Sequence, residues 1–95
     1  DTSIIILEKD AGRVLYANNA FLRLNGIDKE WLSQIYQLKD WLKEWEFFHT
    51  DGSTMSLQET PFSRMLHGED IRRVEMRSYN RISGISYYAL WSGSW

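Results

Sequence analysis

The sequence predicts an α+β fold with an antiparallel β-sheet, and three observations support this. Segments rich in β-branched or alternating apolar residues lie at both ends of the chain, whereas the middle has helical spacing. Short turn sequences join the end segments into hairpins, whose strands are antiparallel. The 95 residues match the length of one domain, which we expect to span residues 1–95.

The first hairpin is expected at residues 4–17, with a Lys-Asp-Ala-Gly turn at residues 9–12. A helix follows, capped by Asn18 or Asn19, because a side-chain amide oxygen can accept from the first free N–H groups. The Asn-Gly pair at residues 25–26 ends this helix.

Apolar residues recur at helical spacing after Asp28, which we expect to cap this region. The region forms one helix or two, because residues 37–40 offer a break, and a turn follows at residues 49–53. The apolar stripe consists of Trp31, Ile35, Leu38, Leu42 and Trp45, widened by Trp41 and Phe48.

Another helix is predicted to begin with Thr60 as N-cap and Pro61 in the first helical position, where a missing N–H is harmless. Gly68 ends it. From Ile71 the apolar period changes to two, and a return strand follows at residues 86–94, so the order is β-β-α-α-α-β-β. We expect one face of the outgoing strand to carry Arg72, Val74 and Met76, and the other Arg73, Glu75, Arg77 and Tyr79.

Composition excludes several classes of protein. Eleven Lys and Arg against 13 Asp and Glu give a net charge of −2, which argues against binding to duplex nucleic acid. The absence of cysteine excludes disulfides, thiolate nucleophiles and cysteine-ligated zinc. The longest apolar run, residues 4–7, is too short to cross a bilayer. Every Lys lies at or before Lys43, so the second half has only Arg as its cation.

Three motifs together resemble the PAS family of sensory domains. Residues 10–21 read D-A-G-R-V-L-Y-A-N-N-A-F, similar to the first hairpin and helix of that family. Residues 51–69 carry the pattern D-G…E-x-P-x-x-R-x-L-x-G-E of a subgroup found in bacterial sensor proteins, and residues 92–94 resemble its fourth strand. The resemblance implies a PAS-like sheet with helices packed on one face, in a cytoplasmic signal-transduction protein such as a sensor histidine kinase.

The resemblance also implies a fifth strand at the centre of the sheet, between the first and the fourth. The sequence ends at Trp95, directly after the fourth strand. We therefore expect the chain to be a fragment of a larger multidomain protein, or the gap to be filled by another chain or by direct pairing of the first and fourth strands.

The residues offer little for catalysis or metal binding. Only His49 and His67 are histidines, no cluster has the spacing of metal ligands, and the carboxylates lie in turns or at helix ends. We therefore expect no enzymatic activity in the domain itself and no metal. Light-sensing PAS domains trap flavin with a cysteine, which is absent here. His67 lies at a helix end, where it is poorly placed to ligate haem. The sequence therefore identifies no cofactor, and a non-covalent small ligand is the expectation that remains.

Two functions compete. The first is a sensory module that binds a small molecule in an apolar pocket between sheet and helices; the expected ligand-binding residues are Tyr16, Phe21, Trp41, Phe62, Met65, Met76 and Trp91. The second is a ligand-free dimerisation or docking module. Large apolar residues occur on both faces of the return strand, so we expect its outer face to meet a second copy or a flanking helix through Tyr87, Tyr88, Trp91 and Trp95.

Overall fold

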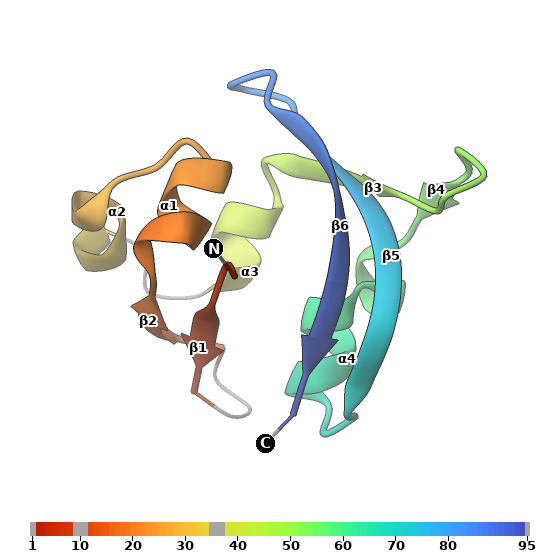
Figure 1. The fold of residues 1–95 in the computed structure, drawn as a ribbon, viewed down its shortest axis with the longest axis horizontal. Helices are drawn as coiled ribbons and strands as arrows, with labels where there is room; N and C mark the ends of the chain where they lie inside the picture. The colour runs from red at the N-terminus through yellow and green to blue at the C-terminus, as the bar shows by residue number, and fades with distance from the viewer. Residues whose placement is uncertain (1, 9–11, 35–37, 95) are drawn as a thin grey trace. The chain divides into compact units, whose positions relative to one another are not determined.

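The computed structural model describes residues 2–8, 12–34 and 38–94 and contains helices together with antiparallel sheets, which confirms the α+β class. The chain divides into two compact units, residues 1–43 and 44–95, called here the first and the second unit (Figure 1). The expectation of a single domain stays a prediction. None of the helices in the described segments is long and apolar enough to span a membrane.

The first unit contains the predicted hairpin and short helices. Strands β1 (Ile5–Leu7) and β2 (Val14–Ala17) pair antiparallel, and α1 (Asn19–Leu24), α2 (Lys29–Gln34) and α3 (Leu38–Leu42) follow. Residues 9–11 of the expected turn at residues 9–12, together with Ile35 and Gln37 near the expected helix break, lie outside the described residues.

Asn18 is the N-cap of α1, as one of the two predicted candidates. Its Oδ1 accepts from the amides of Phe21 and Ile4, both at 2.9 Å, and its Nδ2 donates to the carbonyl of Thr2 at 2.7 Å. One side chain therefore starts the helix and fastens the segment before β1 to it.

The second unit is a four-stranded antiparallel sheet in the order β4-β3-β5-β6. Its strands are β3 (Trp45–Phe48), β4 (Thr54–Met55), β5 (Ile71–Asn80) and β6 (Ser86–Gly93). The short 3-10 helix η1 (Leu57–Glu59) and helix α4 (Pro61–Leu66) connect β4 to β5. Helix α4 lies alongside β5 and β6 (Figure 1).

The predicted limits of α4 are confirmed. The Thr60 side chain accepts from the Ser63 amide, and Pro61 occupies the first helical turn. Gly68 follows the helix with a φ of 93°, a left-handed conformation that glycine adopts without a steric penalty.

The prediction that Trp45 and Phe48 extend a helical stripe is wrong, because both belong to β3. Trp45 and Phe47 are buried and Glu46 between them is exposed, the period-two pattern of a strand. Their backbone groups pair with residues 77–80 of β5, which lie far along the chain. The sequence signal was present: an aromatic run before a turn at residues 49–53 favours a hairpin.

A β-bulge near the start of β5 corrects the predicted faces of that strand. Ile71 pairs with Gly93 and Val74 with Trp91, so β5 has one more residue than β6 over this stretch. Arg73 has a φ of 52°. As a result Ile71 joins the buried set, whereas Arg72, expected on the same face as Val74, is exposed.

Candidate functional site

The inner face of the second unit's sheet, covered in part by α4, brings together four of the seven predicted ligand-binding residues. Phe62 of α4 and Trp91 of β6 make an edge-to-face ring contact with centroids 4.7 Å apart. The Met65 side chain packs directly against Gly93, where any larger residue would collide with it. Met76 of β5 points to the same face of the sheet and is completely buried.

On this inner face, the indole Nε1 of Trp91 and the hydroxyl Oγ of Ser78 are buried and have no hydrogen-bond partner within the described part of the chain. A buried polar group without a partner typically costs about 1–3 kcal/mol, so the indole N–H is suited to donate a hydrogen bond to water or a ligand, and the hydroxyl to donate or accept one. Ser78 was not among the predicted site residues, although its inward position follows from the alternation of β5, which places it on the same face as Val74 and Met76.

Phe21 and Trp41, two further predicted residues, lie in an aromatic cluster of the first unit. The ring centroid of Phe21 is 6.1 Å from that of Trp31 and 6.0 Å from that of Trp41, and the two indoles are 5.0 Å apart. All three residues are buried. These ring geometries are those of a packed core. The three residues belong to the first unit, whereas the four residues described above belong to the second.

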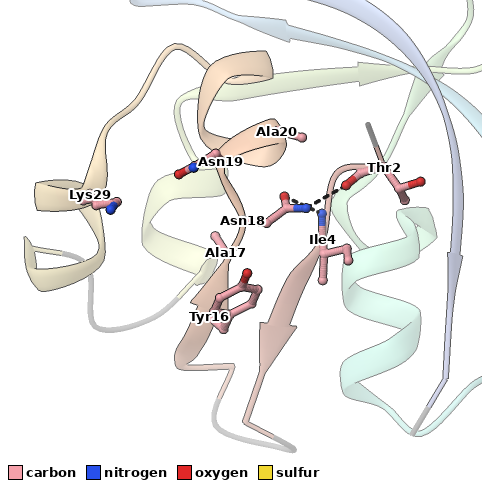
Figure 2. Close-up of a pocket in the computed structure, with 8 residues that line it drawn as sticks. All are labelled: Thr2, Ile4, Tyr16, Ala17, Asn18, Asn19, Ala20 and Lys29. Carbon is pink, nitrogen blue, oxygen red and sulfur yellow. Dashed lines mark hydrogen bonds between the residues drawn. The ribbon is translucent and has the colours of Figure 1, made fainter.

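Tyr16, the seventh predicted residue, is 48% exposed. It lines an open depression of about 650 Å³ on the first unit together with Ile4, Asn18 and Lys29 (Figure 2). The amide of Asn18 in this depression is already bound to Thr2 and Ile4, as the dashed lines in Figure 2 show. The polar groups left to meet a ligand there belong to exposed side chains.

A second depression, of about 490 Å³, lies on the second unit and is lined by charged side chains. The Nε2 of His49 is 3.6 Å from the Oε2 of Glu59, and the Nε of Arg64 is 3.4 Å from the Oε1 of Glu69. A hydrogen bond from the Ser56 amide lowers the pKa of Glu59, and a bond from the Ser53 hydroxyl lowers that of Asp51. These contacts stabilise the local turns.

The two histidines occupy ordinary structural positions. His49 faces Glu59, and the Nδ1 of His67 lies 2.7 Å from the Ser63 carbonyl at the end of α4. Within the described ranges no three His, Asp or Glu side chains gather as a metal site.

The outer face of β6 differs from the predicted one. Side chains alternate along the strand, so Tyr88 and Leu90 project outward and are 71% and 50% exposed. Tyr87 contacts Trp45 and Trp91 contacts Phe62, which places both on the inner face, contrary to the prediction. Trp95 lies outside the described residues.

Two residues of neighbouring strands complete this outer surface. The guanidinium carbon of Arg77 lies 5.0 Å from the centroid of the Phe48 ring, and Arg77 is the cross-strand neighbour of Tyr88. The outward surface of the sheet thus combines exposed apolar side chains with a cation.

No family model, curated protein or solved structure matches this chain.

Proposed function

We propose that the chain is a PAS-type sensory module of a cytoplasmic signal-transduction protein, such as a sensor histidine kinase, and that it binds a small molecule without catalysing a reaction. The motifs at residues 10–21 and 51–69 support this proposal. So do two features of the fold, the opening hairpin followed by a helix and the placement of α4 against an antiparallel hairpin.

One observation carries the proposal: the buried N–H of Trp91 has no acceptor in the described part of the chain and lies beside apolar side chains of α4. An apolar ligand with a carbonyl or similar acceptor would satisfy this donor while packing against Phe62 and Met65. Apolar walls with a few directed polar groups are typical of small-molecule sites.

The same contacts suggest how binding is transmitted. Trp91 belongs to β6, and its cross-strand neighbour is Val74 beside the bulge of β5. A ligand that contacts Trp91 and α4 together favours the arrangement in which both are correctly placed. It shifts the population only to the extent that it binds this arrangement more tightly than the other.

The test is mass spectrometry of small molecules extracted from the purified protein, with an absorption spectrum for haem or flavin. Trp91→Phe keeps an aromatic side chain and removes the indole N–H, so we expect it to lose a co-purifying compound that the parent chain retains. Trp31→Phe is the matched control, since the Trp31 indole N–H is also buried without a partner among the described residues but lies in the first unit. Equal retention by both variants contradicts the assignment.

A docking module without a ligand is the second candidate, favoured by the exposure of Tyr88 and Leu90 on one sheet face. In this alternative, a second copy or a flanking helix covers the outer face. We expect the double variant Tyr88→Ser, Leu90→Ser to abolish self-association. If this variant self-associates as the parent chain does, the outer face is not the docking surface.

A further inference from the structure

Asn25 is the one asparagine of this chain that is followed by glycine; Asn18, Asn19 and Asn80 precede asparagine, alanine and arginine. Asparagine is a chemically labile residue, because the backbone nitrogen of the next residue can attack its side-chain carbonyl carbon. A following glycine has no Cβ to hinder this attack, and its backbone adopts the required conformations readily. The sequence therefore places the most reactive asparagine of the chain at residue 25.

The structure holds Asn25 at the end of α1, in an arrangement that blocks this attack. Asn25 is 3% exposed, and its Nδ2 donates to the carbonyl of Phe21 at 2.9 Å. The N–H of Gly26 donates to the carbonyl of Arg23 at 3.2 Å. The side-chain amide and the attacking nitrogen are thus each bonded to a carbonyl of α1, so they react only when this end of the helix opens.

Deamidation would remove a donor that this helix end uses. The carbonyl of Phe21 accepts from the Nδ2 of Asn25 and also, at 3.2 Å, from its backbone N–H. An aspartate in the same place has an acceptor where the donor was, so a carboxylate would face the Phe21 carbonyl oxygen in a buried position. A buried charge without a partner is strongly destabilising.

We propose that Asn25 is a deamidation site that the folded first unit protects and that opening of α1 exposes. The Gly26 nitrogen attacks Cγ of Asn25 and forms a new C–N bond, while the bond from Cγ to Nδ2 breaks. Nδ2 leaves as ammonia, which takes up the proton lost by the Gly26 nitrogen. Water then opens the cyclic imide at Cγ to give aspartate, or at the backbone carbonyl carbon to give isoaspartate.

This modification makes unfolding of the first unit leave a permanent chemical mark. The products fit the end of α1 less well than asparagine, so a modified chain opens more readily than an unmodified one. The inference is independent of ligand binding and of the proposed function.

The experiment incubates the 95-residue chain at mildly alkaline pH, in buffer and in concentrated urea, and follows each asparagine by peptide mass spectrometry. In urea we expect Asn25 to react faster than Asn19 and Asn80 of the same molecules. In buffer the Asn25 rate should be lower by about tenfold or more, because the closed form predominates. Gly26→Ala should slow the reaction in urea; it is compared there only, because Gly26 has a φ of 67° and alanine would strain the folded chain.

A destabilised variant tests whether the fold provides the protection. In buffer, Phe21→Ala should raise the Asn25 rate about tenfold or more above that of Leu15→Ala, which changes an exposed residue of the same unit. In urea the two variants should react at the same rate. If Phe21→Ala does not fold, a urea series on the parent chain replaces it, and the rate should rise with the unfolded fraction measured by circular dichroism.

The consequence of the modification is measured on variants that carry its product. Asn25→Asp should lower the melting temperature by about 4 °C or more, whereas Asn19→Asp, an exposed position of the same helix, should change it little. Three results would each overturn the proposal: equal rates at Asn25 and Asn80 in urea, equal Asn25 rates in buffer and in urea, or an Asn25→Asp variant as stable as the parent chain.

Discussion

The two units of this chain are stabilised in different ways. The first unit combines very short strands and helices with the hydrogen bonds of the Asn18 side chain and a cluster of three aromatic rings. The second has a long hairpin, β5 and β6, whose register extends from Ile71–Gly93 to Tyr79–Ser86. All lysines lie in the first unit, so the change in composition at Lys43 falls at the boundary between the units. Side-chain packing stabilises the first unit, whereas backbone pairing between two long strands stabilises the second.

The largest expected effect comes from removing a ring of the aromatic cluster. Phe21 is almost fully buried and contacts both Trp31 and Trp41. Phe21→Ala should lower the free energy of unfolding by about 3–5 kcal/mol, through lost burial and the cavity left behind. Urea denaturation measures this, with the exposed Leu15→Ala as control. A loss below about 1 kcal/mol would contradict a central role for the cluster.

A smaller effect distinguishes the two helix caps. Asn18 makes three hydrogen bonds through its side chain, two of them outside α1. Asn18→Ala should therefore lower the free energy of unfolding by about 1–3 kcal/mol. Thr60→Ala, at the cap of α4, should lower it by about 1 kcal/mol.

The cap comparison is made by thermal unfolding of both variants, with Asn19→Ala as the control next to Asn18. If Thr60→Ala lowered the melting temperature more than Asn18→Ala, the hydrogen bonds of the Asn18 side chain could not be the main stabilising contacts of the first unit.

The smallest effect is a pH dependence that we expect at the turns of the second unit. Bonding lowers the folded-state pKa of Glu59 and of Asp51 below their ordinary values of 4.5 and 3.8. Their contribution to stability is therefore present above those values and is lost as the pH falls through the lower folded pKa. Glu59→Gln should reduce thermal stability slightly near neutral pH and make little difference at strongly acidic pH.

Gln58→Ala serves as the control for this pH effect, because it changes an adjacent exposed residue that does not titrate. A Glu59→Gln difference that persists unchanged in acid would contradict the role given to the ionised carboxylate.

The sequence was sufficient for features with local causes. Asn18 as a cap, Thr60 before Pro61 and Gly68 after α4 each follow from the chemistry of a few neighbouring residues. The strand β3 was missed because the spacing of Trp45 and Phe48 also fits a helix, and only pairing with β5 decides between the two.

The residues of the candidate site could likewise be predicted only in part from the sequence. Phe62, Met65, Met76 and Trp91 were expected together, and they share one face of the second unit. Phe21 and Trp41 have the same chemical character but belong to another cluster. Composition marks a residue as apolar and aromatic; its partners depend on the register of strands far apart in the sequence.

The bulge in β5 has a consequence for how the chain can vary in length. Because one residue near Arg73 is unpaired, the strand already contains a one-residue insertion that its neighbour does not match. Deleting that residue would leave a regular ladder in which Ile71 still pairs with Gly93 and stays on the buried face with Val74. The start of β5 is thus a place where the chain can lose a single residue without changing which side chains are buried.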